Sequence, residues 1–253
     1  MNRQFVKLSG VSFSATGLPV IDVTDEEIEL ASMPSLVAWL DPQEKFRSTV
    51  PIGLKDRVNG YGMKNFSAAA PVLGTAINGR PTVNMLVSRT DGLTIEGLNL
   101  HPTGDYTKIV VAKIPAVTAS GRRELCTSES GKCGFSITAS GALRIQHGAT
   151  QLDTTTLTDT AAHIYAATYN AETGVGVVYK DKVALPFTSA GTFPLQAAST
   201  NLGFGVSTSS GGFFEGDMGY GFCFAADYSK PAYKTFWDRI HSILATRYDI
   251  VLP

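Results

Sequence analysis

The stretch from residue 212 to residue 253 reads GFFEGDMGYGFCFAADYSKPAYKTFWDRIHSILATRYDIVLP and decides the fold class. Residues Met218 to Phe224 alternate as they would in a strand. After Asp227 and Ser229, either of which can cap a helix, apolar residues recur at three- and four-residue steps. This apolar stripe comprises Tyr233, Phe236, Trp237, Ile240, Ile243 and Leu244. The chain is therefore predicted to close with a strand and one helix that covers it.

The chain before this stretch contains short apolar runs separated by clusters of Gly, Ser, Asp and Thr. The predicted strands are Ser35–Leu40, Thr82–Val87, Gly92–Leu98, Tyr106–Ile114, Arg122–Cys126, Gly134–Ala139, Ala142–His147, His163–Tyr169, Gly176–Tyr179 and Asn201–Val206. Residues 43–80 are rich in glycine, and we expect loops there. Many short strands without intervening helices predict an all-β fold. We expect a two-sheet antiparallel jelly-roll sandwich with one C-terminal α-helix.

The first 33 residues differ from the rest of the chain. They hold one strand-like start, a Gly-Leu-Pro turn and an acidic patch at Asp25, Glu26 and Glu27. We interpret residues 1–33 as an N-terminal arm and residues 34–253 as one jelly-roll domain. The arm either packs on the domain or attaches the domain to a larger assembly, and the sequence leaves both open.

Composition limits the classes of function. The formal net charge is −1 and only 17 % of the residues are charged, so no basic surface for nucleic acid is expected. No apolar run is long enough for membrane insertion, and no signal peptide is expected. Cys126 and Cys133 flank a turn and are either bridged or free, whereas the third cysteine, Cys223, has no obvious partner. With no Cys-x-x-Cys and no His pair at zinc spacing, we expect no metal and no cofactor.

Several segments, taken in order, resemble the concanavalin A-like lectin/glucanase superfamily in its laminin-G-like form. The matching segments are SLVAWLDP (35–42), NGRPTVNML (78–86), YTKIVVAKI (106–114), GKCGFSITASGALRIQHG (131–148), HIYAATYN (163–170), GVVYKDK (176–182), LGFG (202–205) and FFEGDMGYGFCFAADYS (213–229). The terminal helix, ending in RYDI, is similar to that of bacterial and phage members. The resemblance implies a jelly roll over residues 34–253.

The chain also departs from this family. Tyr220 stands where the closing strand usually has Glu, and Lys182 replaces the usual Gly after Asp181. The Glu-x-Asp-x-x-Glu pattern of the family's glucanases is absent, and no calcium shell can be placed. The resemblance therefore implies a non-catalytic protein without a metal, although fold alone does not determine function.

Two kinds of catalytic site were weighed. A glycosidase needs two facing carboxylates. Glu124 and Glu129 lie on either side of a strand end, and Glu215 and Asp217 lie at strand spacing on one face. A polysaccharide lyase needs a His and a Tyr, with Arg and Gln against a uronate. The fragments Arg122-Arg123-Glu124-Leu125 and Gln146-His147-Gly148 resemble lyase motifs, but alternation places His147 on the Leu143 and Ile145 face. His163 is expected to be structural, His241 to face solvent, and His101 is isolated. We expect no catalytic residues.

Sugar binding is the remaining option, because a sugar offers an apolar face to an aromatic ring and hydroxyls to polar side chains. Arg144, Gln146, Tyr179 and Tyr220 are the predicted ligand-binding residues, expected on one outward sheet face unless some of them pack under the terminal helix.

The function expected from these observations is that of a non-catalytic virion structural or adhesion protein. It would be a phage tail, fibre or head-decoration component, made in the host cytoplasm, with a lectin-like domain. Its expected partners are other virion proteins, reached through residues 1–33, and a host surface polysaccharide; a homo-oligomer is compatible with such a part. The alternatives are a bacterial carbohydrate-binding lectin module and a polysaccharide-degrading enzyme.

Overall fold

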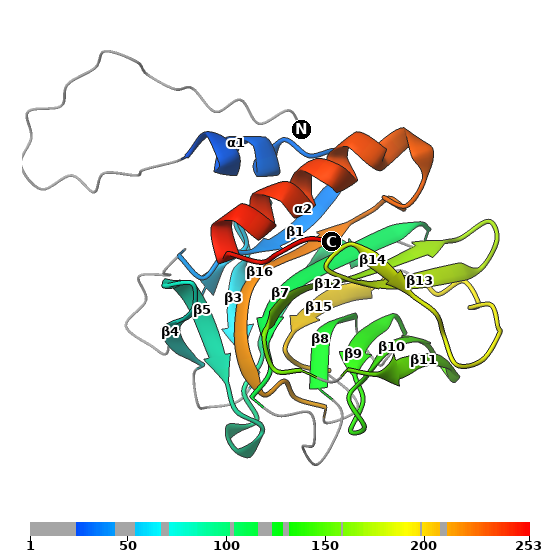
Figure 1. The fold of residues 1–253 in the computed structure, drawn as a ribbon, viewed down its shortest axis with the longest axis horizontal. Helices are drawn as coiled ribbons and strands as arrows, with labels where there is room; N and C mark the ends of the chain where they lie inside the picture. Colours follow the sequence, from blue (N-terminus) through cyan, green and yellow to red (C-terminus); the bar gives the residue numbers. More distant parts are fainter. Residues whose placement is uncertain are drawn as a thin grey trace, which may run out of the picture.

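A computed structural model gives the fold. It describes residues 24–43, 54–66, 71–101, 104–115, 123–128, 132–157, 159–197, 199–207 and 212–253. The expected strand-like start at the N-terminus lies outside these residues. The chain forms two packed antiparallel sheets, with helices over the outer face of one of them (Figure 1). The predicted fold class, an all-β sandwich with a C-terminal helix, is confirmed.

The first sheet, sheet A, contains the closing strand near its centre. Its strands are β1 (Leu36–Leu40), β4 (Val72–Ile77), β5 (Arg80–Met85), β7 (Tyr106–Lys113), β12 (Ala162–Asn170), β13 (Val175–Lys180), β14 (Val183–Leu185) and β16 (Gly216–Phe224). They lie in the order β14-β13-β12-β7-β16-β5-β4, and β1 also pairs with β16. The last strand in the sequence is therefore inserted between β7 and β5, so sheet A is complete only once the C-terminal stretch has joined it.

The second sheet, sheet B, faces sheet A across the core. Its strands are β2 (Leu54–Lys55), β3 (Gly62–Asn65), β6 (Leu93–His101), β8 (Arg123–Ser128), β9 (Gly134–Ile137), β10 (Ala142–His147), β11 (Thr150–Thr156) and β15 (Ser199–Phe204). Their order is β11-β10-β9-β8-β15-β6-β3-β2. The sequence analysis missed α1, β2, β3, β4, β11 and β14. Residues 43–80 were expected to be loops, and this was wrong for β2, β3 and β4, whose short runs with glycine carry little alternation.

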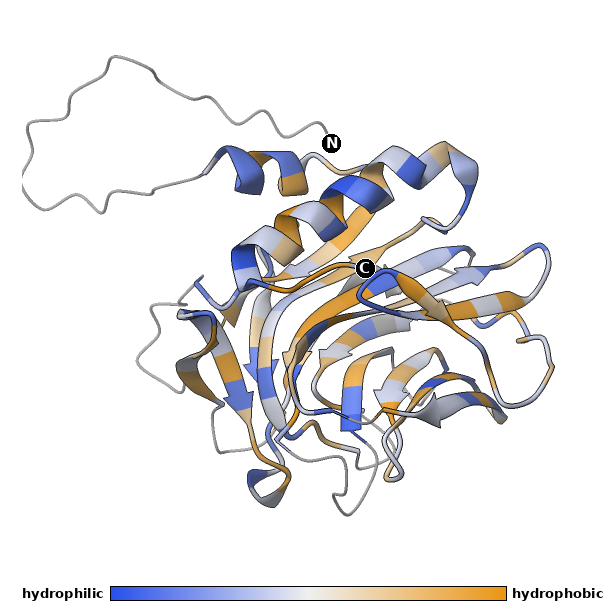
Figure 2. Ribbon diagram, viewed as in Figure 1, coloured by the Kyte–Doolittle hydropathy of each residue, from blue (hydrophilic) through white to orange (hydrophobic). Residues whose placement is uncertain are grey.

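The apolar residues form two cores, one between the sheets and one under the helices. Tyr165, Ala167 and Tyr169 of β12 share a face and point between the sheets, whereas Ile164 and Ala166 point toward the helices. Both cores contain residues of β16. Figure 2 shows apolar residues along the strands and along the terminal helix. The central strands of sheet A are therefore buried on both faces, while the outer face of sheet B is not covered by any described helix.

The terminal helix, α2 (Lys234–Tyr248), follows a short 3₁₀ turn, η3 (Pro231–Tyr233), and packs on sheet A. The Tyr248 hydroxyl accepts a hydrogen bond of 2.9 Å from the backbone N–H of Tyr220. His241 was expected to face solvent, and this is wrong: its side chain is fully buried, with Nδ1 bonded to the Trp237 carbonyl. His241 follows Ile240 on the helix, so it lies at the edge of the apolar stripe, where the ring of Trp237 covers it.

The part of the predicted arm that the structure describes packs on the domain. Thr24 and Glu27 form a capping box that starts the helix α1 (Asp25–Ala31) beside α2. Leu30 and Met33 belong to the core under the helices. Whether residues 1–23 attach to another protein stays a prediction, since they lie outside the described residues.

Other expectations from the sequence can also be compared with the described residues. Cys126, Cys133 and Cys223 are all free, buried thiols. A further 3₁₀ turn, η1 (Val87–Arg89), follows β5. No helix in the described ranges is long and apolar enough to cross a membrane.

Candidate functional site

The structure separates the four predicted ligand-binding residues into two pairs. Arg144 and Gln146 lie on β10 and point outward from sheet B, because Leu143, Ile145 and His147 between them are buried toward the core. Tyr179 and Tyr220 lie on β13 and β16 of sheet A. The expectation that all four share one face was wrong, because strand alternation gives two faces for each strand but not the sheet to which the strand belongs.

The two tyrosines pack under the helices. The ring of Tyr179 contacts the ring of Trp237 on α2, with 4.8 Å between centroids. Tyr220 is buried; its hydroxyl donates to Glu27 Oε1 at 3.3 Å, and the guanidinium of Arg247 lies 4.4 Å from its ring centre. Burial raises the pKa of the Tyr220 phenol far above its usual value. These contacts give both tyrosines a structural role, the alternative that the sequence analysis had left open.

The two outward residues of β10 belong to a polar row that crosses sheet B. Register places Glu124 of β8, Ser136 of β9, Arg144 of β10 and Asp153 of β11 side by side. Arg144 forms a two-pronged ion pair with Asp153, from Nε to Oδ1 at 2.6 Å and from Nη2 to Oδ2 at 2.7 Å. Donation of these hydrogen bonds to the Asp153 carboxylate raises the pKa of the Arg144 guanidinium. In the neighbouring row, the Gln146 amide donates to the Gly148 carbonyl at 2.7 Å.

The floor of this row contains a polar atom that the described protein does not satisfy. Ser136 is 1 % exposed, and its hydroxyl has no hydrogen-bond partner in the part of the chain that the structure describes. Hydroxyls and amides in such surroundings bind polar ligands or water, because a buried polar group without a partner is costly. The row around Ser136 and Arg144 is the candidate site.

A fold-back of the chain borders the row on its β8 side. After β15 the chain turns at Gly205, and Val206 then pairs with Phe213 in an isolated antiparallel bridge. These two paired residues define the fold-back. Thr127 of β8 donates to the Val206 carbonyl at 2.5 Å. A Cβ at Gly203 would lie 2.5 Å from this carbonyl, so only glycine lets the fold-back lie this close to sheet B. The fold-back thus divides the outer face of sheet B into two parts, one formed by β9 to β11 and the other by β6 and β3.

His147 and Glu124, two of the residues weighed for catalysis, are buried. His147 is 1 % exposed, and its Nε2 bonds the hydroxyl of the buried Tyr106 at 2.8 Å while Nδ1 bonds the Pro194 carbonyl. Burial lowers the pKa of His147 to about 4. A polymer cannot reach a His–Tyr pair enclosed between two sheets, so this pair does not support a lyase. Glu124 is fully buried, and its proposed glycosidase partner Glu129, like Arg122 of the lyase fragment, lies outside the described residues.

A second group of charges surrounds His163 on β12. Its Nδ1 lies 2.5 Å from Asp181 and its Nε2 lies 2.5 Å from Asp159, which also pairs with Lys180. Burial lowers the pKa of His163, but the hydrogen bonds that its ring makes to the carboxylates of Asp181 and Asp159 outweigh burial, so that the pKa is raised overall. Because both ring nitrogens are engaged, the imidazole holds the β13–β14 turn in place, in agreement with the structural role predicted for it.

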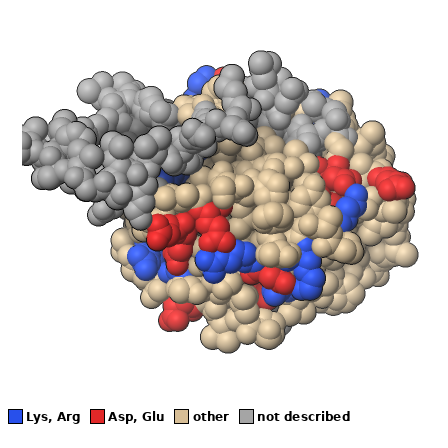
Figure 3. All heavy atoms as spheres, turned by 90° about the horizontal axis from the view of Figure 1, so that it is seen from above, with Lys and Arg blue, Asp and Glu red and all other residues tan. Residues whose placement is uncertain are grey.

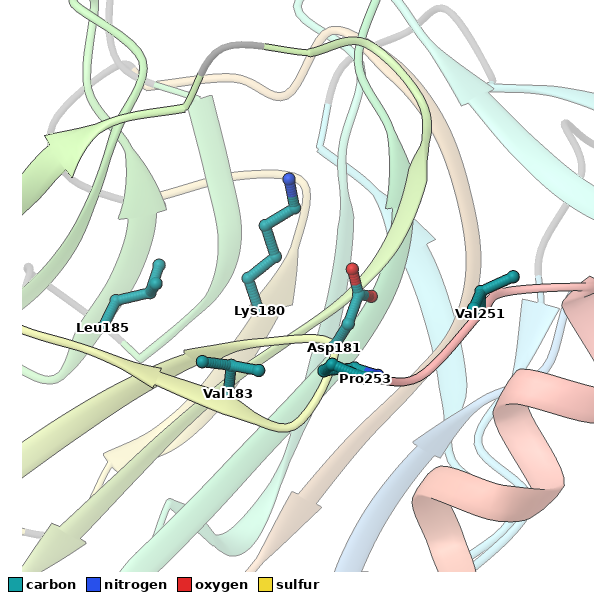
Figure 4. A pocket seen from close by; sticks show the side chains of 6 residues that line it. All are labelled: Lys180, Asp181, Val183, Leu185, Val251 and Pro253. Atoms are coloured by element: carbon teal, nitrogen blue, oxygen red, sulfur yellow. The ribbon is translucent and has the colours of Figure 1, made fainter.

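A shallow pocket lies beside this cluster, between β14 and the C-terminal tail (Figure 4). Its volume is about 360 Å³, and it is lined by Lys180, Asp181, Val183, Leu185, Val251 and Pro253. The lining is mainly apolar, and both charged residues already take part in ion pairs with Asp159 and His163. The pocket therefore offers few groups that would orient a polar ligand.

Lys108 is a polar core residue that sequence reasoning missed. It lies on β7 between the sheets, fully buried, and its ammonium donates to the carbonyls of Cys126 and Cys133 at 3.2 and 2.5 Å. Burial raises the pKa of Cys133 to about 11, and the nearby Lys108 only partly opposes this. Among the described residues, no group of three or more His, Cys, Asp or Glu side chains could hold a metal ion.

Comparison with known proteins was made on sequence and on structure. No protein-family model matches the chain, and no curated protein matches its sequence. Among solved structures, a Trypanosoma rangeli sialidase in complex with sialic acid superposes with a TM-score of 0.58 at 13 % identity. The alignment covers 88 % of this chain and 37 % of the sialidase chain. The likeness is one of fold.

Two further structures share the fold. One is domain 4 of AbnA, an extracellular arabinanase from Geobacillus stearothermophilus, in complex with arabinotriose, with a TM-score of 0.53, 13 % identity, and coverage of 80 % of this chain and 97 % of that domain. The other is the binding domain of botulinum neurotoxin DC in complex with rat synaptotagmin II, with a TM-score of 0.56, 12 % identity, and coverage of 81 % and 52 %. The chain spans little more than a third of the sialidases but nearly the whole arabinanase domain.

Proposed function

We propose that this protein is a non-catalytic carbohydrate-binding β-sandwich of the concanavalin A-like type, and that it binds glycan on the outer face of sheet B. The observation that carries the proposal is the polar row from Glu124 to Asp153, with the unsatisfied Ser136 hydroxyl at its floor. The central strands of sheet A, in contrast, lie under α1 and α2.

The chemistry of the row suits a sugar. Arg144 and Asp153 hold each other in place. The carboxylate lone pairs and guanidinium N–H groups that their ion pair does not use can accept hydrogen bonds from neighbouring hydroxyls and donate hydrogen bonds to them. Gln146 and Gln151 lie opposite each other in the adjacent row and add amide groups. Preorganised polar groups of this kind lose little freedom when a ligand binds.

The comparisons support a carbohydrate-binding fold, since the chain matches nearly all of one arabinanase domain and part of each sialidase. The arabinanase domain has arabinotriose bound, and one of the sialidase structures has sialic acid bound. For this chain, the match to a domain-sized unit favours a binding module.

The experiment is a panel of purified polysaccharides and oligosaccharides, on which bound protein and released sugar are both measured. We expect binding without product. Arg144→Gln should lose most of the binding. Arg239→Gln is the matched control, because Arg239 also forms a two-pronged ion pair, with Glu29 on the helix-covered side. Unchanged binding by Arg144→Gln would refute the site, and released product would refute the non-catalytic role.

We also propose that the module is part of a virion, docked through the arm. The support is limited to the sequence pattern of residues 1–33 and to the way α1 fixes the end of that arm on the domain. Deleting residues 1–23 should abolish incorporation into particles while leaving the thermal unfolding of the domain unchanged. Normal incorporation of the shortened protein would contradict this role.

A further inference from the structure

The β6–β3 part of the outer face carries a feature that the polar row lacks, which is an aromatic pair with one exposed ring. Phe66 follows β3 and is 40 % exposed. Its ring lies 5.5 Å from that of Phe213, the residue that pairs with Val206 in the fold-back. Met63 of β3 points into the core, so alternation directs Lys64 and Phe66 outward on the same face as Arg144.

Polar groups accompany the aromatic pair. Lys64 lies two residues before Phe66 and forms an exposed ion pair of 2.5 Å with Glu96 of β6. Register places Asn201 of β15 opposite Glu96. An exposed aromatic surface beside charged and amide groups matches both sides of a sugar ring, its apolar face and its hydroxyls.

Resting on the proposed function, we infer that sheet B carries a second sugar subsite, formed by Phe66, Phe213, Lys64 and Glu96. Five strand spacings separate β10 from β3, at about 4.8 Å each, or roughly 24 Å in all. A single sugar cannot contact both parts of the face. The ligand is therefore an oligosaccharide chain that passes the fold-back and occupies both subsites.

The charges on the outer face of sheet B indicate that the bound oligosaccharide is uncharged. Lys64 pairs with Glu96 and Arg144 pairs with Asp153, so each of these two cations already has a carboxylate partner. An acidic polysaccharide would bring negative charges toward these carboxylates, and the described cations of these rows are already paired. The hydroxyl groups of an uncharged sugar are not repelled by these carboxylates.

The test measures affinity by titration calorimetry for two ladders of increasing length, neutral arabino- and gluco-oligosaccharides and acidic oligogalacturonates. We expect affinity for one neutral ladder to rise with length. Phe66→Ala should bind the long chain about tenfold more weakly, because one aromatic contact is lost, and should bind the shortest chain like the wild type. Phe236→Ala is the matched control: Phe236 is 38 % exposed but lies on α2.

The outcomes separate the two proposals. Loss of long-chain binding in Phe66→Ala, with an unchanged melting temperature, supports the second subsite. If Phe66→Ala and Lys64→Ala bind every length like the wild type while Arg144→Gln does not, the second subsite is wrong and the proposed function stands. A preference for oligogalacturonate would overturn the uncharged ligand. If the wild type binds neither these ladders nor the polysaccharide panel, the proposed function fails and the inference fails with it.

Discussion

At the scale of single residues, the surroundings of three histidines shift their pKa values in opposite directions. His147 and His241 are buried as neutral rings, and burial lowers the pKa of each to about 4. His163 gains two carboxylate partners, which raise its pKa despite burial. The stability of the protein should therefore depend on pH through individual side chains that do not touch the proposed binding face.

We predict that the free energy of unfolding decreases as pH falls from about 6.5 to 4. In this window the unfolded histidine binds a proton and the buried His241 does not, so protons favour the unfolded chain, at a cost of up to about 3 kcal/mol for one such ring. His241→Phe should show a smaller decrease in denaturant unfolding across this range. An equally steep pH dependence in the variant would contradict the assignment.

At the scale of elements, buried charges hold α1 on the domain. Glu27 accepts from the Tyr220 hydroxyl and lies 3.5 Å from Arg57 and 4.0 Å from Arg247. Arg57 in turn pairs with the buried Asp41 at 2.6 Å. Two residues further along, Glu29 pairs with Arg239 at the surface. Figure 3 shows acidic and basic side chains mixed over the face seen from above.

Glu27→Ala should lower the free energy of unfolding by about 3 kcal/mol, because it leaves buried guanidinium groups with fewer partners. Glu29→Ala on the same helix should cost less than about 1 kcal/mol, since its ion pair is solvated. Chemical denaturation of both variants measures the difference. Equal losses would mean that burial does not govern the docking of α1.

The contact between β16 and α2 depends on a missing side chain. A Cβ at Gly219 would lie 2.7 Å from the ring of Tyr248, whereas a Cβ at Gly62 of β3 would meet no atom within 4 Å. Gly219→Ala should therefore destabilise the protein by roughly 1–3 kcal/mol through overpacking. Gly62→Ala, the control, should stay within about 1 kcal/mol of the wild type. A neutral Gly219→Ala would show that α2 can shift without cost.

At the scale of the whole molecule, the closed sandwich protects its thiols. Cys126, Cys133 and Cys223 are buried around Lys108, and burial raises the pKa of Cys133 and of Cys223 to about 11. A thiol-specific reagent at pH 8 should label no cysteine in the folded protein and all of them in denaturant, because the thiolate is the reactive form. Rapid labelling of the folded protein would show that the sandwich opens.

The sequence by itself determined the fold class and the faces of several strands. The alternation around Leu143 and Ile145, and that around Tyr165 and Ala167, reports which side chains avoid water, and the helical stripe after Ser229 does the same for α2. These are local patterns, and each is read within a few residues. Short strands such as β3 and β14 contain too few residues for such a pattern.

Only the tertiary structure decided which outward faces belong together. Arg144 and Tyr220 both point away from the core between the sheets, but one points to the open face of sheet B and the other lies under helices. That difference depends on pairing between strands far apart in the sequence, such as β16 between β7 and β5. The fold-back that brings Phe213 to Phe66 is likewise non-local, so the aromatic part of the proposed site appears only when the chain is folded.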